Sequence, residues 1–142
     1  MENIGNSVVK TDHKEKVSGA AKYVADLPTE GMLHGKFLRS TVPHAKIKNI
    51  TLPELPDGYM IVDKDDVPGE NKIHIVKEDM PIFAVDTVEY IGDPILMVVG
   101  PDEKKVEEIV SQIIVDYEEL SAVLDATQSE VAFFEFHHAK GD

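Results

Sequence analysis

Histidine is the residue type in this chain best suited to metal binding or proton transfer, and the sequence contains six: His13, His34, His44, His74, His137 and His138. Metal sites need ligands that converge, commonly as a His-x-x-x-His pair on a helix or together with cysteine, and neither arrangement is present. His137 and His138 are adjacent in the tail, where neighbouring side chains of an extended backbone point apart. We therefore expect no metal site, and we expect His44, after Pro43, to cap a turn through a hydrogen bond instead of acting in catalysis.

Three pairs of adjacent carboxylates could in principle act as general acid and base: Asp65-Asp66, Glu107-Glu108 and Glu118-Glu119. Neighbouring residues on a helix or strand do not face each other, so solvated faces explain these pairs better. The serines lack an ordered histidine and acid, and the glycine turns at residues 68–69 and 92–94 lack the lysine of a phosphate loop. The chain therefore offers no constellation that could carry out chemistry by itself.

Composition limits the class of protein. A length of 142 residues corresponds to about one domain. The absence of cysteine excludes a disulfide framework, a thiolate zinc site and a cysteine-ligated iron–sulfur cluster. The first residues do not form a secretory signal, and the longest apolar run, residues 95–99, is too short to span a membrane. We expect a cytoplasmic protein without a membrane partner.

Charge is distributed unevenly along the chain. The net charge is −13, but residues 1–50 carry +3 and each of the two later segments, 51–100 and 101–142, carries −8. An acidic surface repels a phosphate backbone, so nucleic acid is not an expected partner. The basic first third is best explained as a solvated face.

The hydrophobic pattern predicts an α+β domain. We expect strands at residues 32–40, 46–52, 59–62, 87–90, 94–99 and 114–120, and a short strand at 122–124. Residues 16–26 are expected to form a turn and a short strand, broken by Gly19. In the stretch 70–86, residues 72–76 are a further strand candidate, and Pro81 breaks the second half of the stretch. The strand at 46–52 has mixed faces, which indicates an edge or partly exposed position, whereas 94–99 is apolar on both faces and should be central.

One amphipathic helix is predicted at residues 102–113. Val106, Ile109, Val110 and Ile113 recur at helical spacing and form one apolar stripe. Asp102 is a suitable N-cap residue, because its carboxylate can accept a hydrogen bond from the first turn. This helix should cover one face of the sheet.

The two ends of the chain are less regular. Residues 3–12 are polar and are expected to form an arm. The tail contains Phe133, Phe134 and Phe136, which we expect to dock on this domain or on a neighbour, because exposed aromatic rings favour association.

Seven segments, in this order and spacing, resemble the first domain of the large subunit of the xanthine dehydrogenase and aldehyde oxidase family, the α/β hammerhead. They are residues 4–7 (IGNS), 16–28 (KVSGAAKYVADLP), 31–35 (GMLHG), 38–47 (LRSTVPHAKI), 66–69 (DVPG), 88–94 (VEYIGDP) and 115–120 (VDYEEL). The resemblance implies a mixed sheet with one main helix, a hammerhead domain over residues 1–126 with an arm at 1–12, and a tail at 127–142 that leads toward a molybdenum-binding domain. The first motif resembles the start of a bacterial-type molybdenum subunit.

The resemblance also implies a function for the complete enzyme. Family members hydroxylate purines, aldehydes or other heterocycles with oxygen from water, and electrons pass through iron–sulfur clusters and FAD to NAD or another acceptor. The molybdopterin ligands and the catalytic glutamate of the family lie in later domains, and the cluster and flavin sites lie elsewhere. We therefore expect no catalytic, cofactor or metal residue here, and expect the molybdenum domains and the iron–sulfur and flavin subunits or domains as partners.

Six residues match the family pattern and are candidates for structural or interdomain contacts: Tyr23, Arg39, His44, Tyr90, Gly92 and Pro94. Arg39 is the only arginine, and its planar fork suits bidentate pairing with a carboxylate or with backbone carbonyls. The scaffold hypothesis has one alternative, a free-standing acidic interaction module that reuses the fold. A small hydrolase has no supporting triad.

Overall fold

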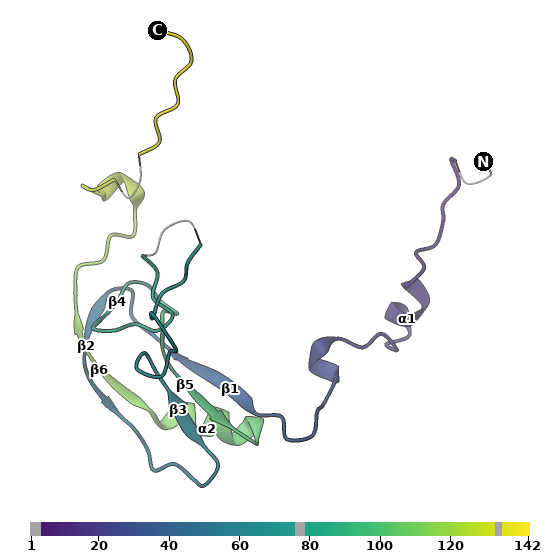
Figure 1. The fold of residues 1–142 in the computed structure, drawn as a ribbon, viewed down its shortest axis with the longest axis horizontal. Helices are drawn as coiled ribbons and strands as arrows, with labels where there is room; N and C mark the ends of the chain where they lie inside the picture. The colour runs from purple at the N-terminus through teal and green to yellow at the C-terminus, as the bar shows by residue number, and fades with distance from the viewer. Residues whose placement is uncertain (1–3, 76–78, 133–134) are drawn as a thin grey trace. The chain divides into compact units, whose positions relative to one another are not determined.

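The computed structural model describes residues 4–75, 79–132 and 135–142. The chain divides into two compact units, Met1–Met32 and Leu33–Asp142, drawn in Figure 1. None of the helices in the described ranges combines the length and the apolar character needed to cross a bilayer.

The first unit contains two short helices and no strand among its described residues. They are α1 (His13–Val17) and the 3₁₀ helix η1 (Val24–Asp26). An ion pair of 2.5 Å between Asp12 and Lys16 supports α1. Of the turn and short strand predicted within 16–26, the turn is present at residues 18–19. The short strand is wrong, because this local ion pair and the hydrogen bond from the Ser18 hydroxyl to the Glu15 carbonyl favour a helical turn.

The second unit is built from two three-stranded sheets, whose pairings among the described residues are all antiparallel. The first has the order β1 (His34–Arg39), β5 (Pro94–Gly100), β3 (Met60–Val62), and the second has the order β4 (Thr87–Val88), β2 (Ala45–Thr51), β6 (Ile114–Glu119). The α+β class with one main helix is confirmed. In place of the single mixed sheet expected from the resemblance, the structure has two antiparallel sheets. One tight turn joins β4 to β5, but the two strands pair in different sheets.

Strand positions agree with the hydrophobic pattern in one sheet and differ in the other. β5 lies between β1 and β3, as its two apolar faces predict. β2 lies between β4 and β6 and is not an edge strand, yet most of its residues remain exposed or half-buried. Of the two alternatives that the mixed faces left open, the partly exposed strand is therefore confirmed and the edge strand is not, because burial of a face and pairing of an edge are separate properties.

The helix α2 (Glu103–Gln112) packs against β1 and β5 and is capped as predicted. The Asp102 carboxylate accepts a hydrogen bond of 2.8 Å from the Lys105 N–H. Val106 and Ile109 are 1% and 2% exposed and join Val88 and Val98 in the core, so the apolar stripe supplies the contact between helix and sheets. Side chains of β2 and β6 pack against the same cluster, which therefore joins both sheets.

Two predicted strands are wrong. Residues 122–124 have no strand structure, and they lead into the 3₁₀ helix η2 (Ala126–Gln128). Within 72–75 the structure has a single bridge, between Ile73 and Met80, because Pro81 interrupts further pairing. Phe133 and Phe134 lie outside the described residues. Phe136 is 76% exposed and its ring stacks on that of His138, and the predicted docking of the phenylalanines on this domain or on a neighbour stays a prediction.

Candidate functional site

The tight turn at residues 90–93 leads from one sheet to the other. The Asp93 N–H donates to the Tyr90 carbonyl at 3.1 Å, and Gly92 has φ +98°. This is the left-handed region, which glycine adopts without the steric cost that a Cβ would bring. Two backbone hydrogen bonds of 2.9 Å then join this turn to Ser40, from Ser40 N to Asp93 O and from Gly92 N to Ser40 O. They continue the pairing of β1 and β5 beyond the bulge at Leu38 and Arg39.

The two buried polar residues at this junction each have hydrogen-bond partners. The Asp93 carboxylate, 4% exposed, accepts a hydrogen bond of 2.9 Å from the Glu89 N–H. The Ser40 hydroxyl, 3% exposed, donates to the Val42 carbonyl at 2.7 Å and accepts from the Val42 N–H at 3.2 Å. Both side chains are therefore engaged in holding turns.

Arg39 contacts the same turn from β1. Its guanidinium donates a hydrogen bond of 2.8 Å to the Gly92 carbonyl, and its Cζ lies 5.0 Å from the centre of the Phe37 ring. Phe37 in turn packs against Phe83 at a centroid distance of 5.9 Å. Arg39 therefore pairs with a backbone carbonyl as expected, but through a single hydrogen bond and not a bidentate pair, and the contact is combined with a cation–π contact.

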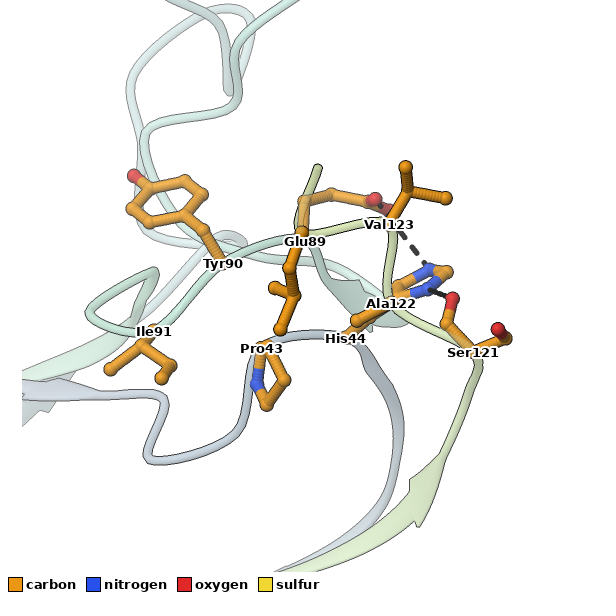
Figure 2. A pocket seen from close by; sticks show the side chains of 9 residues that line it. Pro43, His44, Glu89, Tyr90, Ile91, Ser121, Ala122 and Val123 are labelled. Carbon is orange, nitrogen blue, oxygen red and sulfur yellow. Dashed lines mark hydrogen bonds and ion pairs between the residues drawn. The ribbon is translucent and has the colours of Figure 1, made fainter. Parts of the chain in front are cut away.

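His44 lies in a hollow beside this junction, of about 550 Å³ (Figure 2). Its Nδ1 lies 2.8 Å from the Ser121 carbonyl oxygen, so Nδ1 carries the proton and donates, because a carbonyl can only accept. Its Nε2 lies 3.6 Å from the Glu89 carboxylate. The predicted hydrogen bond of His44 is confirmed, but it ties two segments 77 residues apart instead of capping a local turn.

Tyr90 separates this hollow from a second one, of about 390 Å³ and lined by Asp79, Met80, Pro81 and Asp93 as well as Glu89 and Tyr90. Partial burial, followed by the negative charge of Asp93, raises the pKa of Tyr90 above its ordinary value, while Arg39 opposes the increase. The phenol is therefore a hydrogen-bonding group in neutral solution and not a base.

Five of the six residues chosen from the sequence lie in this region of the second unit. Arg39 and Pro94 are partners across the sheet, Gly92 binds Arg39, and Tyr90 and His44 line the first hollow. Tyr23 belongs to the first unit, where its N–H donates to the Asp26 carboxylate at 3.0 Å. Their role in interdomain contacts stays a prediction.

Sequence reasoning did not select four further residues of the junction: Ser40, Glu89, Asp93 and Ser121. The Gly92-Asp93 turn signal could have indicated Asp93, since aspartate often accepts backbone hydrogen bonds near turns. Ser121 takes part through its carbonyl, which any residue type provides, so no sequence signal could have indicated it.

The junction has no catalytic arrangement. His44 binds the backbone of Ser121 and not its hydroxyl, so no nucleophile is activated. Within the described ranges, no group of three or more histidine, aspartate or glutamate side chains could hold a metal ion. What the residues do is fix one turn, one strand end and the segment after β6 against one another.

Comparison with known proteins gives the family. The model of the "aldehyde oxidase and xanthine dehydrogenase, a/b hammerhead domain" matches residues 18–121. The chain belongs to this family. Its two antiparallel sheets and single main helix are the structure of a hammerhead domain.

Two relatives support the assignment. Over 125 residues the hammerhead chain is 40% identical to a probable xanthine dehydrogenase subunit from Bacillus subtilis (strain 168), covering 86% of this chain and 17% of that protein. Over 123 residues it is 37% identical to the nicotinate dehydrogenase large molybdopterin subunit of Eubacterium barkeri, covering 84% of this chain and 29% of that protein.

Solved structures agree with the fold. The hammerhead chain superposes on quinoline 2-oxidoreductase from Pseudomonas putida 86 with a TM-score of 0.71 and 29% identity, covering 84% of this chain and 16% of that one. For the aldehyde oxidoreductase from Desulfovibrio gigas the TM-score is 0.69 with 29% identity, covering 82% and 15%. The chain thus spans less than a third of each of these four proteins.

Proposed function

We propose that this hammerhead domain is a structural part of the large molybdenum-binding subunit of a molybdenum hydroxylase. The complete enzyme oxidatively hydroxylates a purine, an aldehyde or a related heterocycle with oxygen from water. The observation that carries the proposal is the family match over residues 18–121, together with relatives whose names specify xanthine and nicotinate dehydrogenases. The proposed domain covers residues 1–126, with an arm at 1–12 and a linking tail at 127–142.

The sequence has no ligands for an iron–sulfur cluster, and the described residues offer no group that could hold a metal ion. An iron–sulfur cluster needs cysteine thiolates, and the sequence has none. In the part of the chain that the structure describes, no cluster of potential ligands could hold a metal ion. We therefore place molybdopterin–molybdenum, the iron–sulfur clusters and FAD on the remaining domains or subunits, which are the proposed partners, and derive no chemical step from this chain.

The scaffold role is supported by the apolar surface that the second unit leaves exposed. Ile91, Val123 and Leu124 are 67%, 61% and 84% exposed at the rim of the His44 hollow. Exposed apolar side chains that gather around a hollow are typical of a surface that a partner covers. The alternative, a free-standing acidic module, finds no support among these two relatives, which are both much longer polypeptides.

Coexpression of this chain with the polypeptides that supply the remaining domains tests the proposal. The chain should copurify with the molybdenum polypeptide, and the complex should gain molybdenum content and turnover. Ile109→Asp should abolish the gain, because it places an unpaired charge in the core and unfolds the domain. The matched substitution Lys104→Asp, on the exposed face of α2, should leave it unchanged. A complex that assembles and turns over normally without residues 1–142 would disprove the scaffold role.

A further inference from the structure

The two hollows beside the tight turn share Glu89 and Tyr90. They have volumes of about 550 and 390 Å³, and Figure 2 shows the Tyr90 side chain directed away from His44, on the opposite side of Glu89. One ligand that passes over Glu89 and Tyr90 can therefore contact both hollows.

Acidic side chains line both hollows. Glu89, with 67% of its side chain exposed, lines both hollows, and Asp79 and Asp93 line the second. Among the described residues, no lysine or arginine lines either hollow. The nearby Arg39 guanidinium is engaged with Gly92 and Phe37.

Apolar side chains that line the two hollows lie on both sides of the carboxylates. Ile91, Val123 and Leu124 surround the first hollow, Met80 lines the second, and Tyr90 contributes to both. All five are more than 40% exposed, with Tyr90 at 42% and Leu124 at 84%. An aromatic ring beside a carboxylate suits the aliphatic stem and cationic head of lysine or arginine.

We propose that the two hollows form one docking surface for an extended polypeptide segment in which a lysine or arginine stands next to apolar side chains. The cation pairs with Glu89, its aliphatic stem lies along Tyr90, and the neighbouring apolar side chain enters the first hollow among Ile91, Val123 and Leu124. Successive side chains of an extended segment point to opposite sides, so a segment that lies edge-on over Glu89 and Tyr90 directs its cation toward the second hollow and the neighbouring apolar side chain into the first.

Charge argues against the other occupants. A nucleic acid or an acidic peptide would be repelled by Glu89 and Asp79. A second copy of this chain would bring a further net charge of −13 to a surface where, among the described residues, Glu89, Asp79 and Asp93 line the hollows and no lysine or arginine does. The proposal goes beyond the scaffold function, because it concerns the ligand of this surface and can be tested on the 142-residue chain alone.

The probe is the peptide acetyl-Leu-Lys-Leu-Lys-Leu-amide, added to the ¹⁵N-labelled chain and followed by amide chemical shifts. We expect saturable shifts at residues 79–81, 89–93 and 121–124, with a dissociation constant on the order of 1 mM. Glu89→Gln should weaken binding about fivefold, because it removes the charge that pairs with the peptide lysine. Glu54→Gln removes one exposed charge outside both hollows and should leave binding unchanged. Val123→Ser should weaken binding as well, through its loss of apolar contact.

Four outcomes overturn the proposal. The first is an equal loss of affinity in Glu54→Gln, which means general attraction of a cation to an acidic protein. The second is equal binding of acetyl-Leu-Glu-Leu-Glu-Leu-amide. The third is the absence of localised shifts at about 5 mM peptide, well above the expected dissociation constant. The fourth is concentration-dependent shifts of the same amides without peptide, which would identify a second copy as the occupant.

Discussion

The guanidinium of Arg39 binds the carbonyl oxygen of Gly92 at 2.8 Å, although the two residues are 53 positions apart. Together with the two backbone hydrogen bonds between Ser40 and the turn, this contact holds the end of β1 against the start of β5. The same turn presents Glu89 and Tyr90 to the two hollows. Its stability therefore decides whether the proposed docking surface has a fixed shape.

Arg39→Met should lower the free energy of unfolding by about 1 kcal/mol, because it removes one hydrogen bond and the cation–π contact with Phe37. Arg39→Lys should lose less, since an ammonium retains the charge but not the planar contact. Urea denaturation measures both. Lys36→Met serves as control on the same strand: its partner Glu107 is exposed, so the change should stay below about 0.5 kcal/mol. Equal midpoints for Arg39→Met and the wild type would contradict the prediction.

Gly100→Ala should destabilise the domain by about 1–3 kcal/mol. A Cβ at position 100 would lie 2.2 Å from Cδ1 of the Tyr59 ring, so the ring or the strand has to move. Tyr59→Leu loses packing but leaves room for the added methyl group. The double variant should therefore lose less than the sum of the two single variants, which a double-mutant cycle in urea measures. Strict additivity would mean that ring and methyl group do not collide.

Asn71→Ala should cost about 1–3 kcal/mol, because one side-chain amide satisfies both backbone groups of Phe83. Its Nδ2 donates to the Phe83 carbonyl at 2.7 Å, and its Oδ1 accepts from the Phe83 N–H at 2.9 Å. Asn71→Asp retains an acceptor but places a carboxylate against the carbonyl. It should therefore also destabilise at pH 7 and recover partly when acid protonates the carboxylate. Thermal unfolding of both variants at pH 7 and pH 4 makes the comparison, and an Asn71→Asp midpoint independent of pH would contradict it.

Tyr90 should make the stability depend on pH in alkaline solution. Its pKa in the folded chain is raised by partial burial and then by Asp93, so folding favours the protonated phenol. The stabilisation is complete below the unfolded-state pKa of about 10 and is lost as the pH rises through the higher folded-state pKa. Above pH 10 the urea midpoint of the wild type should therefore fall more steeply than that of Tyr90→Phe.

Absorbance at 295 nm, recorded for the wild type and Tyr90→Phe, gives the titration of Tyr90 as a difference. The transition should lie above the ordinary value of about 10 and move down in Asp93→Asn, which removes the second cause of the shift. A difference curve centred at or below the ordinary value would contradict the assignment.

Hydrophobic patterns over a few consecutive residues predicted the helix α2 and the strand β5 correctly. The stripe that contains Val106 and Ile109 predicted α2, and Asp102 predicted its start, because helix period and capping are properties of a few consecutive residues. The apolar run of β5 predicted a central strand for the same reason. At residues 16–26 the pattern failed, since a short polar segment has no periodicity that separates a helical turn from a strand.

What the sequence by itself determined is the class of the domain, its one main helix and its family. The order and spacing of the motifs indicated the family, and the match of the family model over residues 18–121 confirms it. The tertiary structure decided how the strands divide between two sheets and which distant residues meet. Arg39 meets Gly92 and His44 meets Ser121 across 53 and 77 positions. Such contacts depend on the path of the folded chain and not on spacing, and a backbone carbonyl as partner leaves no mark on residue identity.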